Sequence, residues 1–265
     1  MPESRVLRHD AAGVATLTLN RPAKRNALDV DTFLALEAEL DALEQQVDQV
    51  GVVVLRGAGT GFSAGADVSG PTRSPRRHFQ ASVIERLANL PQPVVGVVHG
   101  FCFTGGLELV LAADLIVAAE SARFADTHAR FGLAAGWGLT QRLPRRVGTY
   151  RAREMMFTTR EYTGPEAEAM GLVNRCVPDD QLDAAADELV GTIVAGSWFS
   201  HREHKRTLLR TDGLPLRDGL ADEVYRTTHV GPDFADRIKD RFGSAGSAGS
   251  AGSAGSSDAA GTPDR

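Results

Sequence analysis

Residues 100–109, with the sequence GFCFTGGLEL, bring together two adjacent glycines and one carboxylate. A strand that ends in glycines and turns into a helix points free backbone N–H groups at whatever lies in front of it. Gly105 has no Cβ, so an oxygen can approach its N–H closely. Glu108 follows about one helical turn later, on roughly the same face. A donor and a carboxylate at this spacing suit proton transfer beside a carbonyl whose oxygen becomes negative. Close-packing glycines and a helix-capping glutamate are the alternative interpretation.

Segments with strand-like and helix-like patterns surround this stretch. Short apolar or alternating runs predict strands over residues 14–19, 52–55, 94–98, 115–119, 122–125 and 172–177. Apolar residues at helical spacing from Phe33 to Val47 predict a helix capped by Asp29 or Asp31. Further helices are expected over residues 78–90, 104–113, 140–158 with a break at Gly148, 165–170, 181–194, 201–210, 216–228 and 232–242. Because strands alternate with helices, we expect an α/β core followed by a mostly helical last third.

Composition excludes several classes of protein. The chain has 265 residues, 42% of them hydrophobic, which suffices for one large domain or for one domain with an appendage. The net charge of −5 argues against a general nucleic-acid binder. Two cysteines make no disulfide framework and fit a reducing compartment. The first ten residues are polar and no apolar run is long enough to span a bilayer, so we expect a cytoplasmic protein without a membrane partner.

Two glycine-rich patterns match known motifs, but the elements predicted next to them do not fit those motifs. Residues 61–65 (GFSAG) match the G-x-S-x-G motif of serine hydrolases, and Asp114 and His128 complete the chain order of a triad. That motif needs a strand directly before it and a helix directly after it, and neither is predicted. Glycines at positions 57, 59 and 61 lack the spacing and the following helix of a dinucleotide-binding loop.

Two basic patterns also have simple interpretations. His201 and His204 have the spacing of metal ligands on a helix, but no third ligand is apparent and the cations beside them would repel a metal ion. No metal site is therefore expected. A set of arginines is interpreted as surface residues, with ligand phosphates as alternative partners: Arg142, Arg145, Arg146, Arg151 and Arg153.

Several motifs then follow one another along the chain. They are LNRP at 19–22 with KRNAL at 24–28, FSAGAD at 62–67, GGLEL at 105–109, AD at 113–114, ARF at 122–124, TQRLP at 140–144 and AMGLV at 169–173. In this order, over most of residues 5–242, they resemble the crotonase family, that is, enoyl-CoA hydratases and isomerases. The resemblance implies an α/β fold, a crotonase-like spiral of ββα units with a helical C-terminal segment. It also implies a homotrimer or a homohexamer built as a dimer of trimers.

The resemblance divides the chain into three parts. The spiral core with the acyl-CoA site is expected over residues 1–195 and the C-terminal helical segment over residues 196–242. The composition of residues 243–265, rich in Gly, Ser and Ala, predicts a flexible tail.

The resemblance also implies an acyl-CoA thioester substrate, with coenzyme A as part of the substrate and no other cofactor. Two backbone N–H groups, on Ala66 and Gly105, are expected to hold the thioester oxygen. Abstracting a proton beside a thioester, or adding water to a conjugated one, puts negative charge on that oxygen, and preorganised donors lower the barrier. The residues expected to bind the substrate and its CoA moiety are Lys24, Arg25, Ala27, Ala64, Gly65, Asp67, Val68, Trp137 and Lys205.

The chain departs from the family pattern at its second catalytic position. A typical hydratase has two glutamates, and Glu108 matches the first. His128 stands where the second is expected, while Thr104 and Ala135 replace a glycine and a proline. A neutral imidazole can take a proton from water, and a nearby ionised glutamate favours its charged form. The alternative is that Glu108 works alone. Asp126, two residues from the matching position, is a further carboxylate with less support.

Three functions follow from this site. Hydration of a 2-enoyl-CoA by Glu108 and His128 is the first hypothesis. Isomerisation of an enoyl-CoA by Glu108 alone is the second. The third is a CoA-ester-binding member of the family with little activity.

Overall fold

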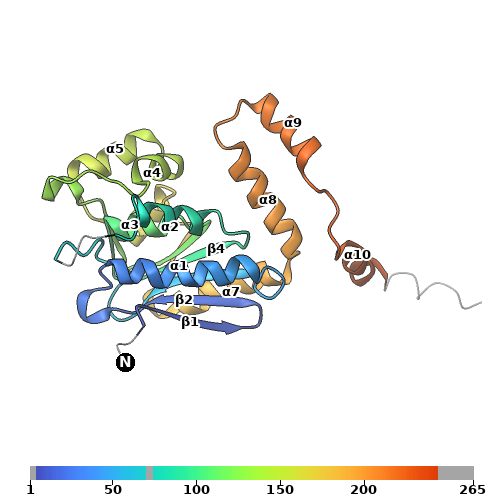
Figure 1. Cartoon of the computed structure of the whole chain (residues 1–265), viewed down its shortest axis with the longest axis horizontal. Helices are drawn as coiled ribbons and strands as arrows, with labels where there is room; N and C mark the ends of the chain where they lie inside the picture. Colours follow the sequence, from blue (N-terminus) through green and yellow to red (C-terminus); the bar gives the residue numbers. More distant parts are fainter. Residues whose placement is uncertain (1–3, 70–73, 244–265) are drawn as a thin grey trace, which may run out of the picture. The chain divides into compact units, whose positions relative to one another are not determined.

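Figure 1 shows a computed structural model of the chain, which describes residues 4–69 and 74–243. The chain forms two compact units, one through Thr227 and one from Thr228. In the second unit, the described residues include one helix, α10 (Phe234–Phe242). No helix among the described residues is long and apolar enough to cross a membrane. Residues 70–73, and residues 244–265 of the expected tail, lie outside the described residues.

A mixed sheet is the centre of the first unit. Among the described residues its order is β1-β2-β3-β4-β6-β9, with β1 antiparallel to β2 and the other neighbours parallel. The strands are β1 (Val6–Ala11), β2 (Val14–Leu19), β3 (Val52–Gly57), β4 (Val94–Val98), β6 (Leu115–Ala119) and β9 (Arg175–Val177).

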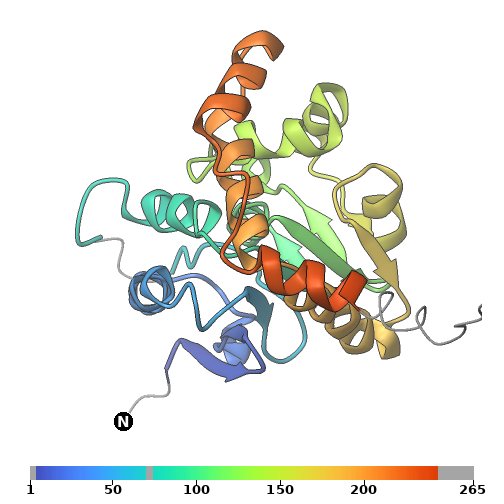
Figure 2. The ribbon, with the colours of Figure 1, turned by 90° about the vertical axis from the view of Figure 1, so that its right-hand side faces the viewer.

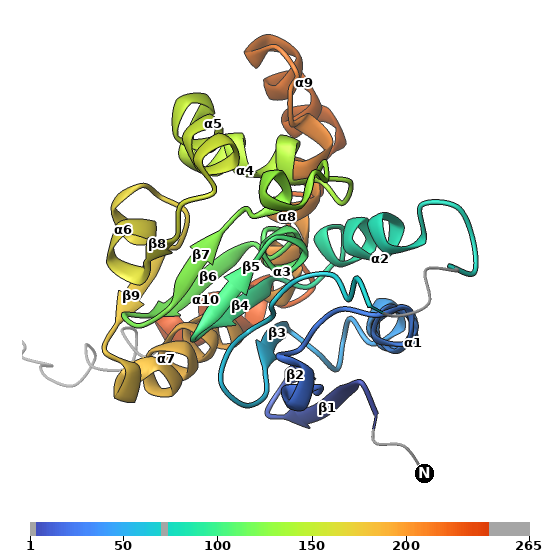
Figure 3. The same ribbon diagram turned by 90° about the vertical axis from the view of Figure 1, so that its left-hand side faces the viewer.

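Helices cover both faces of this sheet. In β3, Val52 and Val54 face a core shared with α7 (Leu182–Ala195), and Val53 and Leu55 face the larger core. The larger core contains apolar side chains of α1 (Val30–Gln45), α2 (Phe79–Ala88) and α3 (Gly105–Val110). Figure 3 shows α7 on one side of the sheet and α1 and α2 on the other. Burial on both faces explains the continuous apolar runs that predicted β3, β4 and β6.

A smaller sheet brings two loops of the chain together. Its strands are β5 (Phe101–Phe103), β7 (Arg123–Ala125) and β8 (Tyr162–Thr163), with β5 and β7 parallel. Because β5 and β7 run in the same direction, the residues that follow them lie side by side. The Thr104 backbone N–H donates to Ala125 O at 2.8 Å. The beginning of α3, with Glu108, therefore lies next to the segment that contains His128.

The remaining helices surround this arrangement. They are α4 (Leu139–Val147), α5 (Thr149–Thr158), α6 (Gly164–Ala169), α8 (Trp198–Thr211) and α9 (Leu216–Arg226), with short 3₁₀ turns η1 (Pro22–Lys24), η2 (His128–Phe131) and η3 (Asp179–Gln181). The predicted break at Gly148 is confirmed, since it separates α4 from α5. Helices α8 and α9 pack side by side (Figures 1 and 2).

The α/β prediction is confirmed, with three local differences. Strand β1 was not predicted because only Val6 of its side chains is buried, so it lacks an apolar alternation. Strand β5 spans three residues within a stretch that had no strand prediction. The helix expected over 104–113 is shorter, Gly105–Val110, because the chain turns into β6 and the Asp114 N–H donates to Val94 O at 2.9 Å.

An ion pair made by a buried lysine joins α8 to the sheet. Lys205 of α8 is 7% exposed, and its Nζ donates to Asp114 Oδ2 at 2.7 Å and to Gln92 O at 3.0 Å. Asp114 Oδ2 also accepts from the Val94 N–H at 2.7 Å. Burial lowers the pKa of Lys205, and Asp114 opposes that shift. The pair therefore ties the C-terminal helices to the ends of β4 and β6.

We expect Lys205→Ala to lower the free energy of unfolding by about 2–3 kcal/mol, because it removes the buried ammonium group that donates to Asp114 Oδ2 and Gln92 O. Urea denaturation followed by circular dichroism measures this change. Arg206→Ala on the same helix is the matched control, because the Arg206 side chain is 55% exposed. That control should cost less than about 1 kcal/mol. Equal effects of the two substitutions would contradict this role of Lys205.

Candidate active site

A cavity of about 570 Å³ opens at the ends of β5 and β7. Its volume is in the range usual for small-molecule sites. Glu108 and His128 are its ionisable lining residues, and Thr104 and Thr127 contribute hydroxyls. The other lining residues are apolar or small: Ala64, Ala66, Val68, Gly105, Phe131, Leu133, Ala134, Gly136 and Trp137. The cavity thus combines an acid/base pair with an apolar wall.

Glu108 is anchored through one of its two carboxylate oxygens. The side chain is 2% exposed, and Oε1 accepts from the Trp137 N–H at 2.8 Å and from the Leu139 N–H at 3.3 Å. Oε2 faces His128 Nε2 at 3.7 Å. Burial raises the pKa of Glu108, and the two backbone donors oppose that shift. One oxygen therefore holds the orientation while the other is free to exchange protons.

His128 is held by Asp126, which the sequence patterns supported less than Glu108 and His128 as a site residue. His128 Nδ1 lies 2.6 Å from Asp126 Oδ1, which also accepts from the His128 backbone N–H at 3.1 Å. A carboxylate can only accept a hydrogen bond, so Nδ1 carries the ring hydrogen. The other ring nitrogen, Nε2, faces Glu108. The hydrogen bond to Asp126 is the largest cause that raises the pKa of His128. The result is a row of three groups, Asp126, His128 and Glu108.

Two backbone donors lie beside this row. A Cβ placed on Gly105 would lie 3.0 Å from Ala66 N, so the Ala66 and Gly105 segments are in close contact. The same Cβ would lie 2.5 Å from the Trp137 ring, so only glycine fits there. Within the described residues, neither Ala66 N–H nor Gly105 N–H has a hydrogen-bond acceptor. Both residues line the cavity, so an oxygen of a ligand can reach these donors.

Thr104 has a backbone conformation that favours glycine. Its φ of +49° and ψ of −109° cost a β-branched residue about 1–3 kcal/mol. The Thr104 and Thr127 hydroxyls are hydrogen-bonded to each other, and the Thr127 N–H donates to Thr104 Oγ1 at 3.2 Å. These contacts offset the strain and join the start of α3 to the segment of His128.

Other predicted residues lie around the cavity without lining it. Lys24 and Arg25 are exposed, and Ala27 is half-buried on the same turn. This turn runs beside the donor segment, because Ala64 N–H donates to Arg25 O at 3.0 Å and Leu28 N–H donates to Gly65 O at 2.8 Å. Their contact with CoA stays a prediction.

Two residues predicted to contact CoA, Asp67 and Lys205, instead bind side chains within the protein. Asp67 accepts from Arg21 Nη1 at 2.6 Å, and the hydrogen bonds from Ser69 and Arg21 lower its pKa well below the usual range. Lys205 is the buried partner of Asp114, and it does not line this cavity. Their side chains therefore have structural partners that the sequence patterns did not indicate.

The motifs set aside above have structural explanations. Ser63 is fully buried and donates to Asn26 O at 2.8 Å, so it is not an exposed nucleophile. His201 Nε2 contacts Ile193 O at 3.0 Å, and the described residues contain no group of three or more metal-binding side chains. Of the predicted surface arginines, Arg142 and Arg146 are partly buried and donate to backbone carbonyl oxygens. No spacing pattern in the sequence signals these contacts.

Comparison with known proteins defines the family. A family profile described as enoyl-CoA hydratase/isomerase matches residues 9–228. A probable enoyl-CoA hydratase of Arabidopsis thaliana, described as peroxisomal, is 32% identical over 222 residues, which cover 81% of each protein. The chain belongs to the enoyl-CoA hydratase/isomerase family, which is a family of enzymes.

Solved structures support the same family assignment. An enoyl-CoA hydratase from Bacillus anthracis has a TM-score of 0.84 and 30% identity, covering 91% of this chain and 96% of that one. A monofunctional enoyl-CoA isomerase from M. smegmatis has a TM-score of 0.73 and 37% identity, covering 82% of this chain and 99% of that one. The predicted family and the crotonase-like fold are confirmed.

We expect Asp126→Asn to lower the pKa of His128, because an amide keeps the acceptor but removes the negative charge. The titration of the His128 ring signal by NMR measures the change, and the other histidine signals serve as internal references. An unchanged pKa would show that Asp126 acts only as a cap of the turn.

The same substitution should change the pH dependence of stability. The folded-state pKa of His128 is raised, so this group stabilises the fold fully below its unfolded pKa of about 6.5. That contribution is lost as the pH rises through the folded-state pKa. Asp126→Asn should therefore destabilise the protein more in acid than above that pKa, as measured by urea denaturation at several pH values.

Proposed function

We propose that this protein adds water across the double bond of a 2-enoyl-CoA thioester. The observation that carries the proposal is the shared cavity. In it, two backbone N–H donors that have no acceptor among the described residues lie beside Glu108 and His128. The hydratase names of the relatives support the same activity. Water and the thioester alone balance the reaction, so the proposal includes no further cofactor.

The Ala66 and Gly105 N–H groups hold the thioester oxygen in this proposal. Adding hydroxide to Cβ pushes electrons onto that oxygen, which becomes negative before Cα is protonated. Backbone donors fixed in a partly dry site need no reorganisation as the charge appears. Each such donor contributes about 3–4 kcal/mol of transition-state stabilisation in well-studied enzymes.

Glu108 and His128 divide the proton transfers between them. The two groups share one proton, and the addition starts when that proton is on Glu108. Neutral His128 then takes a proton from water at Nε2 while the water oxygen bonds to Cβ. Protonated Glu108 then gives a proton to Cα from Oε2, which completes the addition. The groups end as an imidazolium and a carboxylate 3.7 Å apart, and one proton passed between them restores the starting state.

Isomerisation is the second candidate, supported by the likeness to the isomerase from M. smegmatis. In that reaction the Glu108 carboxylate alone removes a proton from one carbon of a 3-enoyl-CoA and returns it to another. His128 then has no required step. A binding protein with little activity is the third candidate, and it predicts CoA-ester binding without turnover.

We expect Glu108→Gln and His128→Ala each to lower the rate of crotonyl-CoA hydration by about 10²–10⁴-fold, because each removes one proton-transfer group. Absorbance at the enoyl thioester band measures the rate, and calorimetry with butyryl-CoA shows that binding is retained. Wild-type hydration by His128→Ala would remove His128 from the mechanism. Faster turnover of a 3-enoyl-CoA than of a 2-enoyl-CoA would favour the isomerase, and binding without any turnover would favour the third candidate.

We further propose that the protein assembles as a homotrimer or a dimer of trimers. Helices α8 and α9 and their connection expose a row of apolar side chains: Leu208, Leu209, Leu214, Leu216, Leu220 and Tyr225. Apolar patches of this kind are typical of subunit interfaces. Nucleic acid and membranes are not proposed as partners.

Sedimentation velocity tests the assembly. We expect wild-type protein to sediment as a trimer or hexamer, and Leu220→Asp to shift it toward monomer, because a charge cannot be buried unpaired in an apolar interface. Arg217→Ala, an exposed position on the same helix, is the control and should keep the wild-type mass. A monomeric wild-type protein would contradict the proposal.

A further inference from the structure

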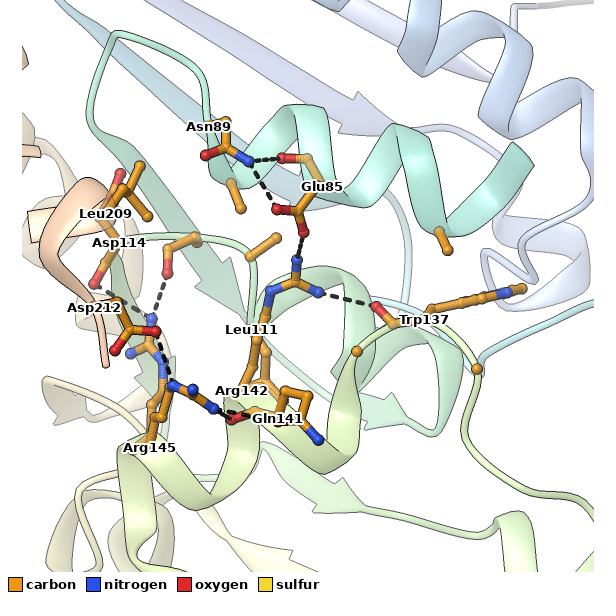
Figure 4. A pocket seen from close by; sticks show the side chains of 17 residues that line it. Glu85, Asn89, Leu111, Asp114, Trp137, Gln141, Arg142, Arg145, Leu209 and Asp212 are labelled. Atoms are coloured by element: carbon orange, nitrogen blue, oxygen red, sulfur yellow. Dashed lines mark hydrogen bonds and ion pairs between the residues drawn. The ribbon is translucent and has the colours of Figure 1, made fainter. Parts of the chain in front are cut away.

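A second cavity, of about 700 Å³, lies behind the candidate active site. Helices α2 and α4 and the residues that follow α3 contribute to its lining (Figure 4). Gly136 and Trp137 line both cavities. The loop before α4 is therefore the wall between them, and a contact made on one side of this wall can reach the other.

Trp137 makes a hydrogen bond on each side of the wall. Its backbone N–H donates to Glu108 Oε1 at 2.8 Å in the catalytic cavity. Its carbonyl oxygen accepts from Arg142 Nη1 at 2.9 Å in the second cavity. Arg142 Nη2 donates in turn to Glu85 Oε2 of α2 at 2.6 Å. Figure 4 shows the last two of these contacts, which run from Glu85 through Arg142 to the Trp137 carbonyl. Together with the contact between the Trp137 N–H and Oε1, they form a continuous chain from α2 to Glu108.

Gly138 shows how closely the guanidinium is fitted to this loop. A Cβ at Gly138 would lie 2.1 Å from Arg142 Nη1, and the φ of +115° also favours glycine. Gly138 O accepts from the Arg142 backbone N–H at 2.9 Å. Arg142 therefore holds the loop through both its side chain and its backbone.

The Trp137 ring is fixed as well. It packs edge-on against Phe33, with ring centroids 5.1 Å apart, and it covers Gly105 so closely that no Cβ would fit there. With its ring, N–H and carbonyl all engaged, Trp137 has little freedom to adjust if one contact is lost.

We propose that Arg142, anchored by Glu85, is a positioning residue for the catalytic carboxylate of Glu108. By holding the Trp137 carbonyl, it keeps the Trp137 N–H on Oε1 and so keeps Oε2 directed at His128. Arg142 itself touches neither substrate nor reacting atoms. This inference rests on the proposed function, in which Glu108 exchanges protons through Oε2.

Arg142→Gln tests the inference. A shorter side chain cannot reach Glu85 and the Trp137 carbonyl together, so we expect kcat for crotonyl-CoA hydration to fall by about 10–100-fold with little change in KM. The Trp137 N–H lowers the pKa of Glu108, so its loss should move the limb of the pH profile that reports Glu108 to higher pH. A purely structural role would change stability without moving the pH profile.

Two further variants sharpen the test. Arg145→Gln is the matched control, because Arg145 lies on the same helix, lines the same cavity and pairs with Asp212 at 3.0 Å. It should keep the wild-type kcat and pH profile. Glu85→Ala removes the carboxylate that anchors Arg142. Because the Glu85 side chain is 64% exposed, we expect this variant to fold even if Arg142→Gln does not. It should lower kcat in the same direction as Arg142→Gln but less.

The outcomes separate the inference from the proposed function. Wild-type kcat and pH profile in both Arg142→Gln and Glu85→Ala, together with an inactive Glu108→Gln, would overturn the positioning role and leave hydration by Glu108 standing. Equal losses in Arg142→Gln and Arg145→Gln would also overturn it, because the effect would then belong to the helix as a whole. A fully active Glu108→Gln would overturn the proposed function and the positioning role together.

Discussion

A carboxylate in the interior of a protein must receive hydrogen bonds in place of the water it loses. Glu108 receives them from the backbone N–H groups of Trp137 and Leu139, at the beginning of α4. This requirement links three parts of the chain: α3, which carries Glu108; the loop of Trp137; and α4, which holds the loop through Arg142. The apolar cores on both faces of the sheet fix the strands from which these parts extend.

The replacement of a glutamate by His128 changes the balance of charge in the site. Two carboxylates facing each other would oppose each other's ionisation. Here an imidazole lies between Glu108 and Asp126, so its charged form is stabilised from both sides. Asp126 also fixes which ring nitrogen faces the cavity. Asp126 therefore sets both the tautomer and the charge preference of His128.

Much of the fold could be predicted from the sequence, because residues such as those of β3 and α1 follow simple apolar patterns that burial imposes. Gly105 and Glu108 could be proposed because they stand in a glycine-rich motif, and His128 because the family resemblance puts it at the second catalytic position. Arg142 could not be predicted, since its contact with the Trp137 carbonyl depends on how a loop folds back onto a helix. The contact of Asp126 with His128 could not be predicted for a similar reason: it forms within a turn, and a turn of this kind leaves no spacing pattern.

The central claim is that a thioester oxygen binds between the Ala66 and Gly105 N–H groups, with its reacting carbons beside Glu108 and His128. A crystal structure with butyryl-CoA, an unreactive saturated analogue, tests this most directly. We predict the thioester oxygen at about 2.7–3.1 Å from both backbone nitrogens, and Cα and Cβ facing Glu108 Oε2 and His128 Nε2. A thioester carbonyl bound away from these two nitrogens, with the acyl chain remote from Glu108, would contradict the account.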